Sequence, residues 1–499
     1  MRLENVSIVD GSGAEPFRGN LQVDGGLLVA IERLPNPPAT GALLVAPGFI
    51  DLHSHSDLQV LEDERREKVL QGVTTEVVGN CGFSPFPQGG HAHELCEFGG
   101  GILGKRDGWG WASAADYLKS VESSGGPVRV GALAGHGSLR VAVAGLAQGP
   151  LSTAQMDQLD GLLDDSLAAG CVGFSTGLMY APGSSAGREE LEQLCTTVAR
   201  RGKLYATHMR SYAAGLVDAV REQIALARAT GCRLQISHLQ AAGRTNWDLQ
   251  QQALDEIGAA RADGVDVEFD IYPYQCGSTV LTQWLPAWSL DGGTEALLAR
   301  LADAATRLLI RQEMEASKAQ QWSDITISAT GSSANQYLVG KTLEEAGPLR
   351  GVAPVDAALD LLMEEQAAVN VISFNQSEPN LRQLLTHPLC SVISDGFYVN
   401  GRPHPRLHGT FPELLGSVVR ERGWMGLAEA VHKITGKPAA RLGLRDRGLL
   451  REGYAADLTI FDPAKIQSRA TYESPDLPPE GITAVVKNGA VISGAIGIT

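Results

Sequence analysis

The sequence predicts a (β/α)8 TIM-type barrel together with a small β-sandwich domain that both termini build. Short apolar segments alternate with amphipathic helical stretches through the middle of the chain, which is typical of parallel strands joined by helices. Eight such units within 499 residues favour a closed barrel. Short strands separated by turns occur at both ends of the chain. Neither end has enough strands to bury a sheet face alone, so we expect the two ends to combine.

The strand candidates near the termini are bounded by hairpin-type turns. They are residues 4–9, 20–23, 27–31, 453–462 and 483–492. From these positions we expect a small β-domain made of residues 1–47 and 440–499. The barrel then takes residues 48–439.

The barrel strands are expected where short apolar runs alternate with helical patterns. The eight candidates are residues 49–53, 75–81, 128–135, 172–176, 204–208, 234–238, 265–272 and 391–395. The clearest helical stretches between them are residues 153–169, 188–201, 215–230 and 249–263. A ninth strand candidate lies at residues 369–374. Residues 277–350 are long for one barrel connection, so we interpret them as an insertion with its own helix at 294–317, placed as a lid over the site.

Two histidines one residue apart end the first barrel strand. In an extended strand alternate side chains share a face, so His53 and His55 point the same way with Ser54 between them. Further metal-ligand residue types end other strands, in chain order Cys81, His208, His238 and Asp395. The carboxyl ends of barrel strands meet on one face, where active sites gather. His136 also ends a strand candidate, and both a place in the wall of the site and a structural role are open for it.

The chemistry of these six residues favours zinc. Neutral imidazoles and one thiolate suit Zn2+ better than magnesium or calcium. A catalytic zinc activates a water, and Asp395 is the carboxylate placed to take the proton of that water and pass it to a leaving group. Taken singly, Cys81 also fits a buried apolar role and Asp395 a turn role. The shared position of all six predicts metal-assisted hydrolysis of a C–N or C–O bond.

The overall composition narrows the class of partner. The chain has 41 Lys and Arg against 57 Asp and Glu, a net charge of −16, and no basic run. We therefore expect a small-molecule substrate and neither nucleic acid nor an anionic membrane as a partner. No stretch has the character of a signal peptide or a membrane span. Seven scattered cysteines are typical of a reduced, cytoplasmic protein. The oligomeric state stays open.

Several short motifs give the chain a family resemblance. They are His53-Ser54-His55, Gly79-Asn80-Cys81-Gly82, Thr207-His208-Met209-Arg210, Tyr272-Pro273-Tyr274, Ser394-Asp395-Gly396, His404-Pro405-Arg406 and Ala455-Ala456-Asp457-Leu458. Through them the chain resembles, nearly from end to end, the D-aminoacylase (N-acyl-D-amino-acid deacylase) family of the amidohydrolase superfamily. The resemblance implies the zinc-dependent hydrolysis of N-acyl-D-amino acids to a carboxylate and a free D-amino acid.

The resemblance also implies a division of the metal ligands. A tight zinc would be held by Cys81, His208 and His238, and a second, weaker site would be formed by His53 and His55. Many relatives use a carboxylated lysine as the metal bridge. Residues 171–178, in the fourth strand candidate, contain no lysine, which is consistent with a cysteine bridge.

For the substrate, the resemblance implies that Asp395 acts as general base and then as general acid, while Arg406 grips the carboxylate and Tyr272 assists. The family pattern His-His-Lys, whose lysine also contacts the carboxylate, is replaced here by a segment that ends in the uncharged Gln240. Gln240 keeps a second hypothesis open, a cyclic-amide (hydantoinase-like) or dipeptide hydrolase on the same barrel. The missing fourth-strand lysine argues against a hydantoinase. A non-catalytic relative is disfavoured because all six metal positions are filled.

Overall fold

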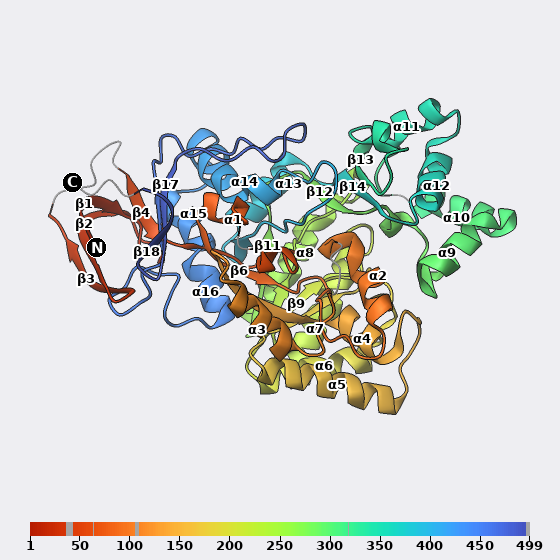
Figure 1. Ribbon diagram of the computed structural model, residues 1–499, viewed down its shortest axis with the longest axis horizontal. Helices are drawn as coiled ribbons and strands as arrows, with labels where there is room; N and C mark the ends of the chain where they lie inside the picture. The colour runs from red at the N-terminus through yellow and green to blue at the C-terminus, as the bar shows by residue number, and fades with distance from the viewer. Residues whose placement is uncertain (36–42, 63, 105–108, 318, 496–499) are drawn as a thin grey trace.

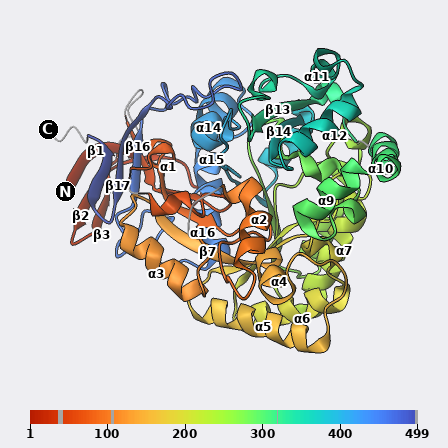
Figure 2. The ribbon, with the colours of Figure 1, turned by 45° about the vertical axis from the view of Figure 1, so that its right-hand side comes forward.

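Eight parallel strands form the central barrel of the computed structural model (Figures 1 and 2). The structure describes residues 1–35, 43–62, 64–104, 109–317 and 319–495. The barrel strands are β5 (Phe49–Asp51), β6 (Val73–Val78), β7 (Arg129–Gly135), β8 (Gly173–Gly177), β9 (Leu204–His208), β10 (Arg233–Ile236), β11 (Val267–Ile271) and β15 (Cys390–Val392). Each hydrogen-bonded pair of neighbours in this order runs parallel. The prediction of an eight-stranded barrel is confirmed.

The predicted helices cover the outside of the barrel. They are α5 (Thr153–Ala168), α6 (Arg188–Arg200), α7 (Leu216–Thr230) and α8 (Leu249–Ala262). Local signals explain where they begin and end. Ser152 and Gln155 form a capping box at the start of α5, and α7 ends at Gly231, whose φ of +73° suits a residue without a Cβ. Leu159 and Leu163 of α5 are buried, as expected for the apolar face of an amphipathic helix.

The other helices, apart from those of the inserted unit described below, fall into three groups. Some lie in the remaining barrel connections, one lies directly before β15, and the rest lie between β15 and the last three strands of the chain. They are α1 (Glu67–Leu70), α2 (Ala92–Leu103), α3 (Ala114–Ser124), α4 (His136–Ala144), α13 (Glu378–Thr386), α14 (Arg406–Glu413), α15 (Leu427–Lys433) and α16 (Gly436–Leu442). After α14 the chain continues as a π-helix through Leu414–Glu421. Within the described part of the chain, no helix is both long and apolar enough to cross a membrane.

Buried polar groups join β5 and β15, which lie at the two ends of the strand order. Lys68 Nζ lies 2.6 Å from Asp51 Oδ2 and 2.6 Å from Ser394 Oγ. The Ser394 backbone N–H donates to Asp51 Oδ1 at 3.0 Å. One residue further on, the N–H of Asp395 donates to the carbonyl of His53 at 2.8 Å. Lys68 and Asp51 are 1% and 0% exposed, so a fully buried ion pair closes the barrel beside its strand ends.

Strands from both ends of the chain form one continuous seven-stranded sheet beside the barrel (Figure 1). In spatial order they are β18 (Ala490–Gly494), β17 (Ile482–Lys487), β16 (Leu458–Phe461), β4 (Leu44–Pro47), β1 (Arg2–Ile8), β2 (Phe17–Asp24) and β3 (Leu27–Arg33). β4 connects the halves because it pairs parallel with β1 and antiparallel with β16. Ile8, Leu21 and Leu458 share one core. A small β-domain built by both termini is confirmed, while its boundaries at residues 47 and 440 stay a prediction.

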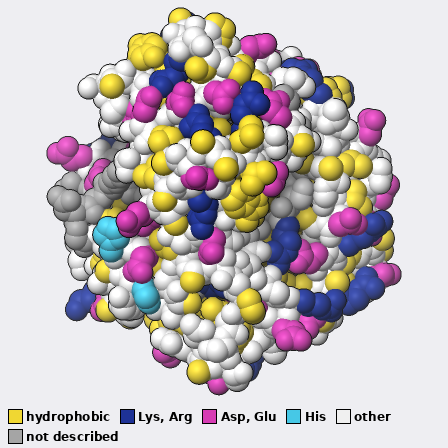
Figure 3. Space-filling view, turned by 90° about the vertical axis from the view of Figure 1, so that its right-hand side faces the viewer, with side chains coloured by type: hydrophobic (Ala, Val, Ile, Leu, Met, Phe, Trp, Pro, Cys, Tyr) yellow, Lys and Arg dark blue, Asp and Glu magenta, His cyan; other side chains and the backbone are white. Residues whose placement is uncertain are grey.

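A separate α/β unit lies between β11 and β15 and forms the upper right of Figure 2. Its antiparallel sheet has the order β12 (Cys276–Val280), β14 (Val369–Phe374), β13 (Ile325–Thr330). Its helices are α9 (Gly293–Ala302), α10 (Ala304–Ser317), α11 (Leu343–Arg350) and α12 (Pro354–Glu364). Leu297, Ile327 and Leu359 belong to a hydrophobic core of its own. Cationic and anionic side chains are intermingled over the face in Figure 3, and Arg307 pairs with Asp360 at 2.6 Å.

Two features of this insertion differ from the prediction. The single helix expected at residues 294–317 is two helices, because the backbone of Asp303 is extended and its carboxylate accepts the N–H of Thr306 at 2.8 Å to start α10. The insertion also runs past residue 350 to Phe374. The ninth strand candidate, 369–374, is β14 and pairs with β12 and β13 instead of entering the barrel.

The buried ion pair predicts a strong effect of one substitution on stability. Replacing Lys68 with Met leaves the Asp51 carboxylate buried without its cation, so we expect Lys68→Met to lower the free energy of unfolding by about 3–5 kcal/mol. Urea-induced unfolding followed by circular dichroism measures this loss. The control is Lys465→Met, because Lys465 pairs with Asp462 at 3.4 Å but is 78% exposed, and we expect a change of about 0.5 kcal/mol or less. Equal losses in the two variants would contradict the role given to Lys68.

Candidate active site

All six predicted ligand residues are buried at the carboxyl ends of barrel strands. Three overlapping groups of them place their ligand atoms within 4.8 Å of one another, among the described residues. The groups are Cys81, His208 and His238; His53, His55 and Cys81; and His53, His238 and Asp395. Cys81 belongs to two groups, so its sulfur lies between two sets of nitrogen donors. The structure therefore brings the whole predicted set together at one point.

Most of these residues lie in the turns just after the strands, and only His208 lies within one. The backbone φ angles of Cys81, His238 and Asp395 are +53°, +34° and +48°, in the left-handed region that non-glycine residues rarely adopt. Hydrogen bonds fix two of these turns. The N–H of His238 donates to Asp270 Oδ1 at 2.7 Å, and the N–H of Asp395 donates to the carbonyl of His53 at 2.8 Å. Backbone strain held by the surrounding structure is concentrated at functional sites.

The spacing of the donor atoms fits a zinc ion. Cys81 Sγ lies 3.4 Å from His53 Nε2 and 3.5 Å from His238 Nε2, and His208 Nδ1 lies 3.1 Å from His238 Nε2. Zinc bonds of about 2.0–2.3 Å in tetrahedral geometry place neighbouring donor atoms roughly 3.3–3.8 Å apart. The donor chemistry agrees, because thiolate and imidazole together are ligands that zinc prefers.

Charge and burial set the protonation of these groups. Burial lowers the pKa of His238 to about 4 and places that of His208 well below its ordinary value. Burial alone would raise the pKa of Asp395, but the charges of Arg406 and His53, with hydrogen bonds from His53 and His55, outweigh it and hold that pKa well below the usual range. His208 and His238 are therefore neutral donors, and Asp395 is a charged carboxylate at neutral pH.

A cavity of about 250 Å³ opens beside the donor atoms. One wall is apolar and includes Phe83, Ile102, Met179, Leu285 and Met314, of which the last two come from the insertion. The predicted substrate residues belong to the polar part of the lining. They are Gln240, Tyr272 and Arg406. The barrel and the insertion thus enclose a space of the size that a small molecule needs.

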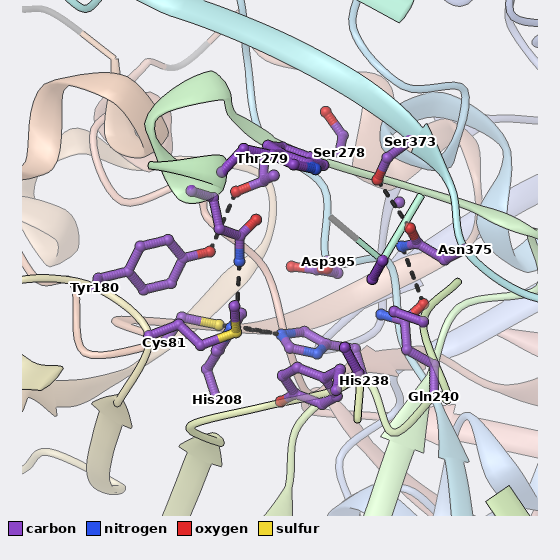
Figure 4. A pocket seen from close by; sticks show the side chains of 18 of the residues that line it. Cys81, Tyr180, His208, His238, Gln240, Ser278, Thr279, Ser373, Asn375 and Asp395 are labelled. Atoms are coloured by element: carbon purple, nitrogen blue, oxygen red, sulfur yellow. Dashed lines mark hydrogen bonds between the residues drawn. The ribbon is translucent and has the colours of Figure 1, made fainter. Parts of the chain in front are cut away.

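Arg406 is the cation on the polar side of the cavity. Its Nη1 lies 2.9 Å from Asp395 Oδ2, and its Nη2 donates to the carbonyl of Ser278 at 3.3 Å. The guanidinium carbon lies 4.5 Å from the centre of the Tyr272 ring, in stacking distance. Gln240 lies near the same tyrosine, with 3.4 Å between its Nε2 and Tyr272 Oη. Figure 4 shows Asp395 and Gln240 facing the same space.

Asp270, a residue of β11, also belongs to the site, although the strand-end pattern did not predict it. Its Oδ1 lies 3.5 Å from His53 Nδ1 and accepts the N–H of His238, while its Oδ2 accepts from Gln235 at 2.9 Å. It therefore contacts two predicted ligands and orients both. A carboxylate directly before the last residue of the strand Val267–Ile271 is the signal that could have identified it, although the same strand holds a second carboxylate, Glu268.

His136 is placed away from the cavity, which favours the structural role over a place in the substrate-binding wall of the site. It begins α4, is fully buried, and its Nε2 lies 2.7 Å from Glu190 Oε1. Arg140 binds the same carboxylate at 2.6 Å. His136 is absent from the described lining of the cavity. The histidine follows a barrel strand as predicted, but its ring points to a buried ion-pair cluster between α4 and α6.

A closed parallel barrel that gathers imidazoles, a thiolate and a carboxylate at its strand ends defines a metal-dependent hydrolase. The chain belongs to the amidohydrolase family, whose model matches residues 39–493. It is 35% identical to an N-acyl-D-glutamate deacylase of Alcaligenes xylosoxydans xylosoxydans, over 98% of this chain and 93% of that protein. It is 34% identical to a D-aminoacylase of the same organism, with the same coverage. The resemblance to the D-aminoacylase family is thereby confirmed.

A solved structure agrees with these relatives. The crystal structure of N-acyl-D-glutamate deacylase from Bordetella bronchiseptica, complexed with zinc and a phosphonate inhibitor that mimics the tetrahedral intermediate, matches with a TM-score of 0.83 and 34% identity. The match covers 98% of this chain and 96% of that chain. The shared fold therefore includes the barrel, the insertion and the β-domain.

The donor cluster predicts that one cysteine controls metal content. We expect Cys81→Ala to lose most of its bound zinc, because it removes the one thiolate donor, which belongs both to the group with His208 and His238 and to the group with His53 and His55. Zinc per chain, measured by plasma emission spectrometry after dialysis, checks this. Cys171→Ala is the control, since Cys171 is equally buried but belongs to no ligand group among the described residues. Full zinc content in Cys81→Ala, or equal loss in both variants, would contradict the assignment.

Proposed function

We propose that the protein uses zinc to hydrolyse the amide bond of N-acyl-D-amino acids, releasing a carboxylate and a free D-amino acid. Arg406 carries the proposal, because its guanidinium lines the same cavity as the donor cluster and lies 2.9 Å from Asp395. The cavity can therefore hold an anionic group next to a metal and a proton acceptor. The similarity to an N-acyl-D-glutamate deacylase and a D-aminoacylase supports this substrate class.

Two ligand sets would divide the metal between a tight and a weaker site. Cys81, His208 and His238 form a three-donor set, which with one open position is typical of catalytic zinc. His53 and His55, beside Asp395, would hold a second ion. When bound, zinc supplies Lewis-acid activation of a water and of the acyl carbonyl. The zinc in the related Bordetella bronchiseptica structure supports the choice of metal.

Asp395 would move the proton. Its Oδ1 lies 3.3 and 3.2 Å from His53 and His55 Nε2, and its Oδ2 faces Arg406. As a charged carboxylate it accepts a proton from the attacking water. It then returns that proton to the amine nitrogen of the leaving amino acid, so a single residue serves as base and as acid.

Arg406 and Tyr272 would bind the carboxylate of the substrate. A guanidinium offers several N–H donors in one plane and suits a carboxylate better than an ammonium does. The stacked Tyr272 ring holds that plane, and its hydroxyl adds a donor at the same end of the cavity. The apolar part of the lining, with Met179 and Leu285, suits the uncharged part of the substrate.

We also propose that the enzyme works in the cytoplasm. All seven cysteines are free, and five of them are buried. Free thiols are typical of a reducing compartment. Fractionation of the native source, with an antibody to this protein, tests the location.

The substrate class is tested with a pair of enantiomers. We expect the zinc-loaded protein to release free amine from N-acetyl-D-methionine and not from N-acetyl-L-methionine, because the metal, Asp395 and Arg406 fix three points around the chiral carbon. A colorimetric amine assay under identical conditions compares them. Equal turnover of the two enantiomers, or of neither, would remove the proposed substrate class.

Asp395→Asn tests the proton transfer. An amide cannot accept the proton of the water, so we expect kcat to fall by roughly 10²–10⁴-fold. Zinc content should stay close to that of the wild type, because the cysteine and the strand-end histidines remain. Steady-state kinetics and metal analysis on the same preparation check both. A kcat within about threefold of the wild type would exclude Asp395 as the base.

Arg406→Ala tests the carboxylate clamp. We expect kcat/KM for N-acetyl-D-methionine to fall by roughly 10²-fold or more, as for a buried charged hydrogen bond that loses its partner. Because Arg406 also contacts Asp395, the matched control is the uncharged substrate N-acetyl-D-methioninamide. The smaller loss of kcat/KM expected for this substrate measures the effect of Arg406→Ala on Asp395 alone. Equal losses with both substrates would rule out the clamp.

A further inference from the structure

Gln240 stands where the resembling family has a lysine, and its carboxamide lines the cavity. A carboxamide carries a donor and an acceptor, so its effect on a substrate depends on which end faces the cavity. The neighbours of Gln240 decide this orientation. One of them, Asn375, directly follows the last strand of the insertion, and the other, Tyr272, directly follows barrel strand β11.

Asn375 is the neighbour that binds the oxygen of Gln240. Its Nδ2 donates to Gln240 Oε1 at 3.1 Å. Its own Oδ1 is occupied by two donors, Gln320 Nε2 at 2.9 Å and Ser373 Oγ at 2.9 Å. The amide of Asn375 thus has its oxygen toward the insertion and its N–H group toward the barrel. Figure 4 shows the line of hydrogen bonds from Ser373 through Asn375 to Gln240.

The position of Asn375 itself is fixed by the chain around it. It follows β14 directly, where the insertion returns to the barrel. Its backbone carbonyl accepts from the N–H of Gly243 and from Trp247 Nε1, both at 2.9 Å. A Cβ on Gly277 would lie 2.6 Å from Asn375 Nδ2 and 2.8 Å from Tyr272 Oη. Because glycine has no side chain, the Asn375 amide and the Tyr272 hydroxyl can both pack against its backbone.

Because Gln240 Oε1 accepts a hydrogen bond from Asn375, Gln240 Nε2 points away from Asn375. That nitrogen lies 3.4 Å from Tyr272 Oη, at the end of the cavity where Arg406 stacks on the same tyrosine. One N–H of Gln240 is directed to the tyrosine at this long distance. The group therefore presents a neutral donor beside the guanidinium.

We propose that Gln240 donates a hydrogen bond to the substrate carboxylate beside Arg406, and that Asn375 is the positioning residue that fixes this orientation. The inference rests on the proposed function, since it assigns a binding group for the same substrate. A neutral donor replaces the ammonium that the family resemblance implies, so the ion pair from Arg406 and the neutral donors Tyr272 and Gln240 hold the carboxylate. The insertion thereby controls substrate affinity through an amide that need not touch the substrate.

The test is a double-mutant cycle on N-acetyl-D-methionine. Gln240→Leu removes the donor, and we expect KM to rise roughly tenfold with kcat within about threefold. Asn375→Asp leaves only acceptors at that position, so the amide of Gln240 must reverse and point its oxygen at the carboxylate. We expect KM to rise at least as much. In the Gln240→Leu background the same Asn375→Asp change should raise KM much less, because that background contains only the effect of the added charge.

A second variant reverses the amides from the far end. Gln320→Glu can only accept, so it draws the N–H group of Asn375 toward itself, turns the Asn375 oxygen to Gln240, and should raise KM in the same way without altering either residue. Zinc content and thermal midpoint confirm that each variant is folded. Gln320→Glu also tests the proposal if Asn375→Asp does not fold.

The outcomes separate the two proposals. If the wild type hydrolyses no N-acyl-D-amino acid, the proposed function fails. If the wild type is active but Gln240→Leu leaves KM unchanged, Gln240 is not a carboxylate donor. If the effects of Gln240→Leu and Asn375→Asp simply multiply, Asn375 does not act through Gln240 and its positioning role is overturned.

Discussion

The buried ion pair between Lys68 and Asp51 is the interaction on which the site depends. Parallel strands β5 and β15 are at opposite ends of the strand order, so the barrel needs a connection between them. Lys68, Asp51 and Ser394 make it from three separate elements at distances of 2.5–3.0 Å. Asp51 lies two residues before His53, and Ser394 lies directly before Asp395. The same contacts that close the barrel therefore set the separation between a histidine donor and the carboxylate that it faces.

The convergence of the donors also depends on left-handed turns after three strands. Cys81, His238 and Asp395 each hold a positive φ that an isolated peptide would seldom keep. Asp270 and the carbonyl of His53 bind the N–H groups of two of these residues, so both turns are held by neighbouring strands. Hydrogen bonds between neighbouring strands thus offset the free-energy cost of the left-handed backbone. Donor atoms 3.1–3.5 Å apart are the result, a spacing that suits a shared metal ion.

The sequence predicted the elements that depend on local residue patterns. It did not predict strand pairing or side-chain direction, which depend on residues far away along the chain. Apolar runs and helical periodicity are local, so the eight strands and the main helices were correct. Residues 369–374 were recognised as a strand, but their partners lie up to 98 residues away along the chain (Cys276 with Phe374), and no local pattern indicates that β14 pairs with β12 and β13. Position at a strand end was not sufficient for His136, because a residue that starts a helix can turn its ring away from the barrel axis. Asp270 was missed because burial, which a sequence does not show, is what makes that carboxylate informative.

The barrel supplies the metal-binding and proton-transfer residues of the cavity, and the insertion supplies residues that would select the substrate. The metal donors, Asp395 and Arg406 all follow barrel strands or open α14, and their geometry is tied to the strand ends. Leu285, Met314 and Asn375 come from a unit with its own core, or from its junction with the barrel. Residues of that unit can change without disturbing the strand turns, whereas a change in the turns would move several donors at once. The amide link from Asn375 to Gln240 is one place where the two parts meet, and it joins them through a substrate-facing side chain while leaving the catalytic carboxylate to the barrel.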